Sequence, residues 1–188
     1  MKLRQLFSRS KLRFVSQPLT MSVPRMPKVG RSSFLWLNTQ GLKGRTVSIK
    51  LLVADDHEVV RSGIGTLLDG SDVEIVGLSG TVEETVSLTK SMHPDVVLLD
   101  VRLGSEDGLT ALEQIRTEAP EVTVVMMSTY DNPTYVARAI ALGATDYVLK
   151  DSSRVDILEA IQRAASREQP SETSILRRVQ STMEKRKD

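Results

Sequence analysis

Five short apolar runs recur between residues 47 and 167, and stretches with helical spacing separate them. The runs are rich in Val, Ile and Leu, which is typical of strands buried on both faces of a sheet. Strands that alternate with helices pair in parallel, so the pattern predicts an α/β fold with a five-stranded parallel sheet. The predicted strands are IKLLVA (49–54), VEIVGL (73–78), DVVLLD (95–100), VTVVMMS (122–128) and DYVLK (146–150).

The stretches between the runs place apolar residues three or four positions apart, as helices that pack one face on a sheet do. In the first stretch, Val59, Ile64, Leu67 and Leu68 are expected to face the core. Gly143 follows the fourth stretch and is expected to end that helix.

The charge of the chain is unevenly distributed. Residues 1–46 contain ten Lys or Arg and no acidic residue, while residues 47–188 contain 15 basic and 24 acidic residues. We expect a basic, disordered extension at 1–46, a folded domain at 47–167, and a linker with an amphipathic tail helix at 168–188. For residues 1–46, a basic arm that touches nucleic acid or an anionic membrane, a targeting peptide, and a natural start near Val47 are alternatives.

Composition excludes several classes of protein. The chain has no cysteine, so disulfides, thiolate metal sites and cysteine nucleophiles are ruled out. Only His57 and His93 are available as imidazole ligands, which argues against a zinc site. No run of about 18 apolar residues is present, and we expect a cytoplasmic protein without membrane contact.

Polar residues stand at the ends of four predicted strands. Asp55 and Asp56 follow the first strand, Asp100 ends the third, Ser128 the fourth and Lys150 the fifth. Parallel strands end at one edge of a sheet, so these side chains are expected within one crevice. Gathered carboxylates repel one another unless a cation lies between them, and Mg²⁺ prefers hard oxygen ligands while leaving positions open for phosphate. The set suits phosphoryl transfer to an aspartate.

The segments VADDHEVVR, PDVVLLDVRLGSEDG, VVMMST and GATDYVLKD resemble, in order and spacing, the receiver domain of bacterial two-component response regulators. The resemblance covers roughly residues 48–166 and is closest to the LuxR/NarL-type subfamily. It implies a flavodoxin-like (βα)5 fold that accepts a phosphoryl group from a sensor histidine kinase with the help of Mg²⁺. Such a domain phosphorylates itself but is not a turnover enzyme.

The resemblance also assigns roles. Asp100 would be the phosphoacceptor, and Mg²⁺ would be held by Asp55, Asp56, Asp100 and the backbone carbonyl of Arg102. For Asp55 alone, a helix N-cap is the alternative. Leu103-Gly104 stands where the family usually has Met-Pro, which predicts a looser loop. A phosphatase of the haloacid dehalogenase type would need a second acid where Arg102 stands.

The remaining roles concern the response to phosphorylation. Lys150 would pair with the incoming phosphoryl group, and Ser128, or its neighbour Thr129, would donate a hydroxyl to it. Tyr147 resembles the family's switch aromatic. The signal would pass to the face formed by the fourth helix, fifth strand and fifth helix, which is also a possible homodimer contact.

Two functions follow from the resemblance. In the first, the chain is a receiver whose output is a protein contact. In the second, it is a LuxR-type DNA-binding transcriptional regulator whose output domain is lost or truncated, because a helix-turn-helix domain needs about 60 further residues. DNA binding is not supported by this chain alone.

Overall fold

The computed structural model describes residues 48–185, and the expectations for residues 1–46 lie outside them. Five parallel strands form one sheet in the order β2-β1-β3-β6-β7, which is a flavodoxin-like arrangement. The predicted fold is confirmed, and every predicted strand end agrees to within one residue. The strands are β1 (Ile49–Ala54), β2 (Val73–Ser79), β3 (Val96–Asp100), β6 (Thr123–Ser128) and β7 (Asp146–Leu149).

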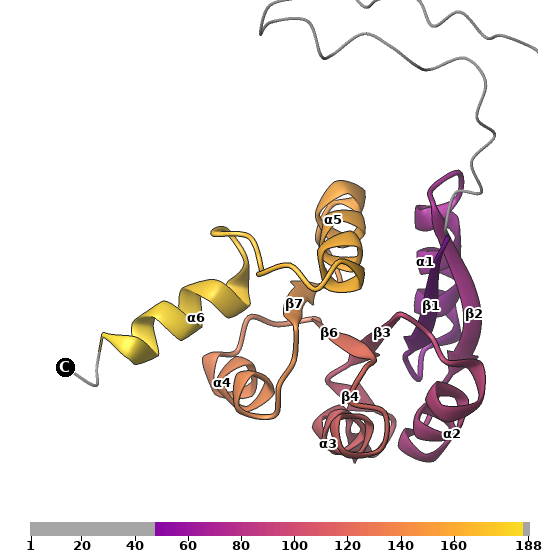
Figure 1. Ribbon diagram of the computed structural model, residues 1–188, viewed down its shortest axis with the longest axis horizontal. Helices are drawn as coiled ribbons and strands as arrows, with labels where there is room; N and C mark the ends of the chain where they lie inside the picture. Colours follow the sequence, from indigo (N-terminus) through magenta and orange to yellow (C-terminus); the bar gives the residue numbers. More distant parts are fainter. Residues whose placement is uncertain (1–47, 186–188) are drawn as a thin grey trace, which may run out of the picture. The chain divides into compact units, whose positions relative to one another are not determined.

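Helices cover both faces of the sheet (Figure 1). On one face lie α1 (Glu58–Leu68) and α5 (Arg154–Ala165), and on the other α2 (Val82–Met92), α3 (Gly108–Glu118) and α4 (Pro133–Ala141). Successive strand residues point to opposite faces. In β1, Leu51 and Val53 therefore pack with α1 and α5, while Leu52 and Ala54 pack with the other helices. A strand covered on both sides has to be apolar at each of these positions.

The start of α1 differs from the prediction. Ile64 and Leu68 are buried as expected, but Val59 is 83% exposed, and its neighbour Val60 packs against the core instead. Asp55 is not the N-cap, because the chain turns into the helix two residues later, at His57. The alternative reading of Asp55 as a helix cap is therefore wrong.

The segment after β3 forms a small antiparallel hairpin rather than a loose loop. Its strands are β4 (Arg102–Leu103) and β5 (Glu106–Asp107). Leu103 is buried in the core and anchors the hairpin, while Gly104 turns the chain at a φ of 63°. The Asp107 side chain then accepts a hydrogen bond from the Leu109 backbone and caps α3.

The predicted tail helix is present as α6 (Ile175–Glu184), which packs against α4 and the edge strand β7. Leu176 is 4% exposed, and Ile175 and Val179 join the same apolar core. The Ser174 hydroxyl donates a hydrogen bond to the buried Asp146 carboxylate at the start of β7. None of the helices in residues 48–185 has the length and hydropathy needed to span a bilayer.

Candidate functional site

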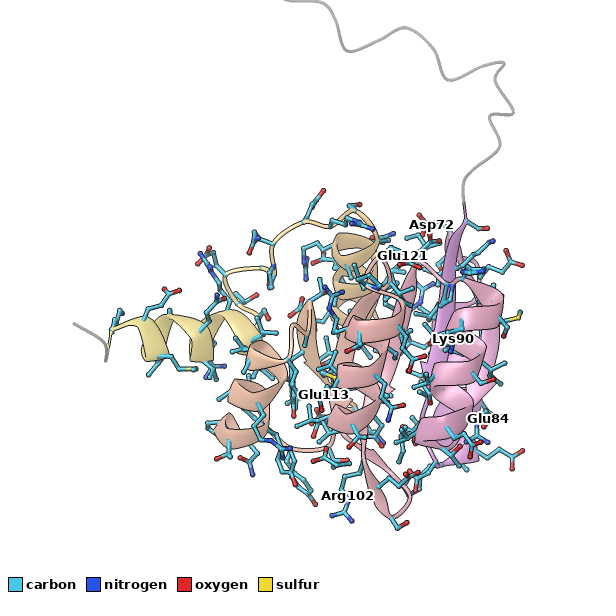
Figure 2. All side chains as sticks on the ribbon, turned by 60° about the horizontal axis from the view of Figure 1, so that its bottom comes forward. Asp72, Glu84, Lys90, Arg102, Glu113 and Glu121 are labelled. Carbon is cyan, nitrogen blue, oxygen red and sulfur yellow. The ribbon has the colours of Figure 1, made fainter. Side chains whose placement is uncertain are left out.

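A cavity of about 420 Å³ opens at the edge of the sheet where the strands end. In Figure 2, Arg102 on the hairpin after β3 marks this end of the domain, while Asp72 and Glu121, which precede β2 and β6, mark the opposite end. The cavity wall includes five of the residues singled out from the sequence, together with His57: Asp56, His57, Asp100, Arg102, Ser128 and Lys150.

Lys150 bridges two buried carboxylates. Its Nζ lies 2.6 Å from Asp55 Oδ2 and 2.7 Å from Asp100 Oδ2. Asp55 is 0% exposed and Asp100 4% exposed, so without the ammonium two like charges would face each other away from water. The ends of three strands, β1, β3 and β7, supply this group.

Burial and charge act against each other at this bridge. Burial raises the pKa of the Asp100 carboxyl, the hydrogen bond and charge of Lys150 lower it in part, and the charge of Asp55 adds to the rise. Burial alone would lower the pKa of Lys150, but the hydrogen bond to Asp100 and the negative charges of Asp100 and Asp55 outweigh it and raise that pKa. Lys150 is therefore held as a cation.

The other oxygens of these carboxylates face a different set of donors. Asp55 Oδ1 accepts a hydrogen bond from the His57 backbone N–H at 2.8 Å, and Asp100 Oδ1 accepts one from the Arg102 backbone N–H at 3.3 Å. The His57 ring lies beside Asp56, whose side chain is 29% exposed. One ligand atom from each of Asp55, Asp56, His57 and Asp100 lies within 4.8 Å of the others, so this group has the donors and the spacing to hold a divalent cation.

Ser128 and Tyr147 share one hydrogen-bond acceptor. Ser128 Oγ donates to the Tyr130 carbonyl at 3.1 Å and accepts from the Tyr130 N–H at 3.2 Å. The Tyr147 hydroxyl reaches the same carbonyl at 3.3 Å, and the ring is 2% exposed. Burial raises the pKa of Tyr147, so the phenol stays protonated and remains a donor. Thr129, the alternative to Ser128, also lies in the cavity wall but is exposed.

Gly108 is required by the backbone of Asp100. A Cβ at position 108 would lie 1.9 Å from the Asp100 carbonyl oxygen, which no side chain tolerates. The Gly108 N–H also donates to the Val101 carbonyl at 2.7 Å. The glycine eight residues after Asp100, part of the motif read from the sequence, therefore allows α3 to start directly against the end of β3.

Sequence reasoning gave no site role to several residues of the cavity wall, among them Asn132, Tyr135 and His57. Asn132 and Tyr135 come from the start of α4, which turns toward the cavity after β6, and His57 comes from the start of α1. No strand-end pattern points to Asn132 or Tyr135, because Asn132 caps α4 and Tyr135 lies in its first turn. His57 directly follows the acidic pair, but only the hydrogen bond from its backbone to Asp55 brings its ring beside them.

Comparisons with known proteins agree with this geometry. Residues 51–162, more than half of the chain, match the family model described as the response regulator receiver domain. The response regulator protein VraR of Staphylococcus saprophyticus is 34% identical over 139 residues, which cover 73% of this chain and 66% of that protein. VraR of Staphylococcus aureus is 33% identical over 141 residues, 74% of this chain and 68% of that protein. The chain thus spans about two thirds of the length of these relatives.

Solved structures show the same fold. The signal receiver domain of the putative response regulator NarL from Mycobacterium tuberculosis is 33% identical with a TM-score of 0.59, and the match covers 63% of this chain and 97% of that one. A DNA-binding response regulator of the LuxR family from Staphylococcus aureus is 26% identical with a TM-score of 0.58, and the match covers 62% and 98%.

Proposed function

This chain belongs to the response regulator receiver domain family and acts in phosphorelay signalling, and from that premise we propose that Asp100 is the residue that accepts the phosphoryl group. The donor is a phosphohistidine on a sensor histidine kinase. A carboxylate oxygen of Asp100 attacks the phosphorus, a P–O bond forms as the P–N bond breaks, and the released imidazole takes up a proton. The product is an acyl phosphate on Asp100.

The observation that carries this proposal is the position of Asp100 within its cluster. Its carboxylate lies in the cavity wall and 2.7 Å from Lys150 Nζ. Asp55 is fully buried, and Asp56 Oδ1 lies 2.8 Å from the His57 ring rather than from an ammonium. Of the three aspartates, Asp100 alone is accessible to a phosphodonor and also contacts an ammonium group. After the transfer, that ammonium can stabilise the negative charge on the phosphoryl oxygens.

We propose that Mg²⁺ is bound by Asp55, Asp56, Asp100 and the backbone carbonyl of Arg102. The donor set supports this, because three carboxylates converge, and Oδ2 of the buried Asp55 accepts no hydrogen bond from residues 48–185 although Lys150 Nζ is close. When bound, Mg²⁺ neutralises charge on the phosphoryl oxygens. Asp55 and Asp56 hold the cation in place, and Lys150 supplies a second positive charge beside Asp100.

Ser128 and Tyr147 are proposed to report the modification. To donate to a phosphoryl oxygen, the Ser128 hydroxyl has to leave the Tyr130 carbonyl, which it contacts at 3.1 Å. That carbonyl then keeps the Tyr147 hydroxyl at 3.3 Å and the Asn132 backbone N–H at 3.1 Å as its donors. The switch would thus strengthen one hydrogen bond at the expense of another and move the loop that carries Tyr130.

The test is phosphorylation by acetyl phosphate with Mg²⁺, read as hydroxylamine-labile phosphate by intact mass. Asp100→Asn should abolish the incorporation, because an amide oxygen cannot form the acyl phosphate. Asp131→Asn, which changes an exposed aspartate before α4, serves as the matched control and should be labelled like the unaltered chain. Unchanged labelling of the Asp100 variant would refute the assignment.

The output of the signal is proposed to pass through α4, β7 and α5, the face that also serves as a candidate homodimer contact. Since α6 packs against α4 and β7, either contact requires α6 to move or to take part. A role in transcription is the second candidate, because one similar structure is a DNA-binding response regulator of the LuxR family. A gel shift that weakens steeply with salt would favour it for this chain.

A further inference from the structure

His57 is placed to take part in the cation site rather than to cap α1. It occupies the N-cap position of α1, but its side chain makes no capping hydrogen bond. Instead the backbone N–H of His57 binds Asp55 Oδ1, and this turn brings the ring back over the two acids that precede it. The ring nitrogen Nδ1 lies 2.8 Å from Asp56 Oδ1 and 3.3 Å from Asp55 Oδ1.

These separations are those of neighbouring ligands on one ion. A six-coordinate cation with ligands at about 2.1 Å has adjacent ligand atoms about 3 Å apart. The two distances from Nδ1 bracket that value. Lys150 does not block the position, because its Nζ contacts Oδ2 of Asp55 and Asp100, while Nδ1 faces the Oδ1 atoms of Asp55 and Asp56.

A second observation points to a bound ion. Oδ2 of Asp55 is buried and accepts no hydrogen bond from the described residues, even though Lys150 Nζ lies 2.6 Å away. Lys150 supplies one positive charge to both Asp55 and Asp100, so together with Asp56 the group keeps an excess of negative charge that a divalent cation would balance. The His57 side chain is 67% exposed, so an ion can reach the group from solvent through the cavity that His57 and Asp56 line.

We propose that His57 is a ligand of this site through Nδ1, and that the site takes a six-coordinate first-row transition cation such as Mn²⁺ in preference to Mg²⁺. The reason is ligand chemistry: Mg²⁺ prefers oxygen donors, whereas imidazole nitrogen adds affinity for transition cations. The inference deepens the cation site of the proposed function and rests on it.

The experiment uses the untagged full chain, stripped with chelator, and two probes. Pulsed electron paramagnetic resonance of bound Mn²⁺ should show a nitrogen coupling from imidazole in the unaltered chain and none in His57→Ala. Titration with Co²⁺ should show binding about tenfold or more weaker in His57→Ala, while Mg²⁺ affinity changes by no more than about twofold. His93→Asn is the matched control, because His93 is the second of the two histidines and has a φ of 46° that Asn tolerates.

The outcomes separate this inference from the proposed function. A nitrogen coupling that disappears with His57 and persists in the His93 variant supports it. No coupling in the unaltered chain, or equal or tighter Co²⁺ binding without His57, overturns it, and the imidazole then only pairs with the acids. Labelling of Asp100 with acetyl phosphate and Mg²⁺ in the unaltered chain and in His57→Ala tests the phosphoacceptor separately.

Discussion

Asp100 and Asp146 are both buried aspartates of the central sheet, but they lie at opposite strand ends and among different neighbours. Asp100 ends β3 and is 4% exposed, while Asp146 begins β7 and is 3% exposed. Burial raises the pKa of both carboxyls. Around Asp100 stand Lys150 and Asp55, whereas Asp146 meets the Ser174 hydroxyl and the Tyr147 N–H, with Arg163 at 4.0 Å.

The difference teaches that a buried acid with a raised pKa does not by itself mark a functional site. Asp100 shares a solvent-connected cavity with further ionisable groups, so its charge can change partners. Asp146 is closed in by donors from β7 and from the residue before α6, with an α5 arginine nearby, and it joins three elements of the fold. Asp100 is open to a cavity and to other ionisable groups, whereas Asp146 holds neighbouring elements of the fold together.

The largest expected difference between the two regions concerns their cations. Lys150→Ala should destabilise the domain by about 3 kcal/mol near neutral pH, because two buried carboxylates are left without a positively charged partner. Arg163→Ala should cost about 1 kcal/mol or less, because its contact with Asp146 is long and the Ser174 bond remains. Urea denaturation of both variants measures the two values. Equal losses would remove the distinction drawn here.

A second difference concerns what each region holds in place. Leu176→Ala should cost about 2 to 3 kcal/mol in the docking of α6, because a buried side chain of the α4–α6 contact is removed. Amide hydrogen exchange should quicken in α6 and leave the strands unaffected. Phosphorylation of Asp100 by acetyl phosphate should be retained. Met183→Ala, at a 39% exposed position of α6, is the control and should change neither hydrogen exchange nor labelling. Loss of labelling with Leu176→Ala would show that the α6 contact and the Asp100 site are coupled.

The smallest expected effect is a pH dependence at Asp146. Its pKa is raised in the folded state, so between the unfolded and folded pKa values the native protein binds more protons. Stability should therefore fall as pH rises through this window above about 3.9, by about 1.4 kcal/mol per pKa unit of the rise. Asp146→Asn should remove this contribution, which thermal unfolding from pH 4 upward can measure against the unaltered chain.

Ser174→Ala sharpens the same measurement. The Ser174 hydrogen bond lowers the pKa of Asp146 in part, so its loss should raise that pKa further and extend the window toward higher pH. If the pH range over which stability falls is unchanged in Ser174→Ala, Ser174 does not influence the pKa of Asp146. Ser181→Ala, on the exposed side of α6, is the matched control.

The sequence predicted the sheet and the strand-end residues because both depend on local patterns and on one rule of topology. Leu51 to Ala54 are apolar at every position, which requires cover on both faces. Asp100 and Lys150 are 50 residues apart, yet both end parallel strands, so they had to meet at one edge.

What the sequence did not predict depends on side-chain direction and on the partners of amphipathic faces. The periodicity in α1 does not distinguish Val59 from Val60, since both are apolar and stand in the first turn. The ring of His57 turns toward the acids because of a backbone hydrogen bond that no spacing reveals. The apolar side of α6 was clear, but its occupant was not, because the pattern does not say whether a helix covers its own domain or another molecule.

The segment 166–174 joins α6 to α5. It would keep α6 close to its contact surface on α4 and β7 even when α6 detaches. Such a tether gives α6 an effective concentration on the order of millimolar, so α6 would compete with any partner of that surface. A partner of α4 and β7 would bind more weakly the larger the fraction of molecules in which α6 is docked. Substitutions in the tail would thus change how readily a partner binds this surface without altering Asp55, Asp56 or Asp100.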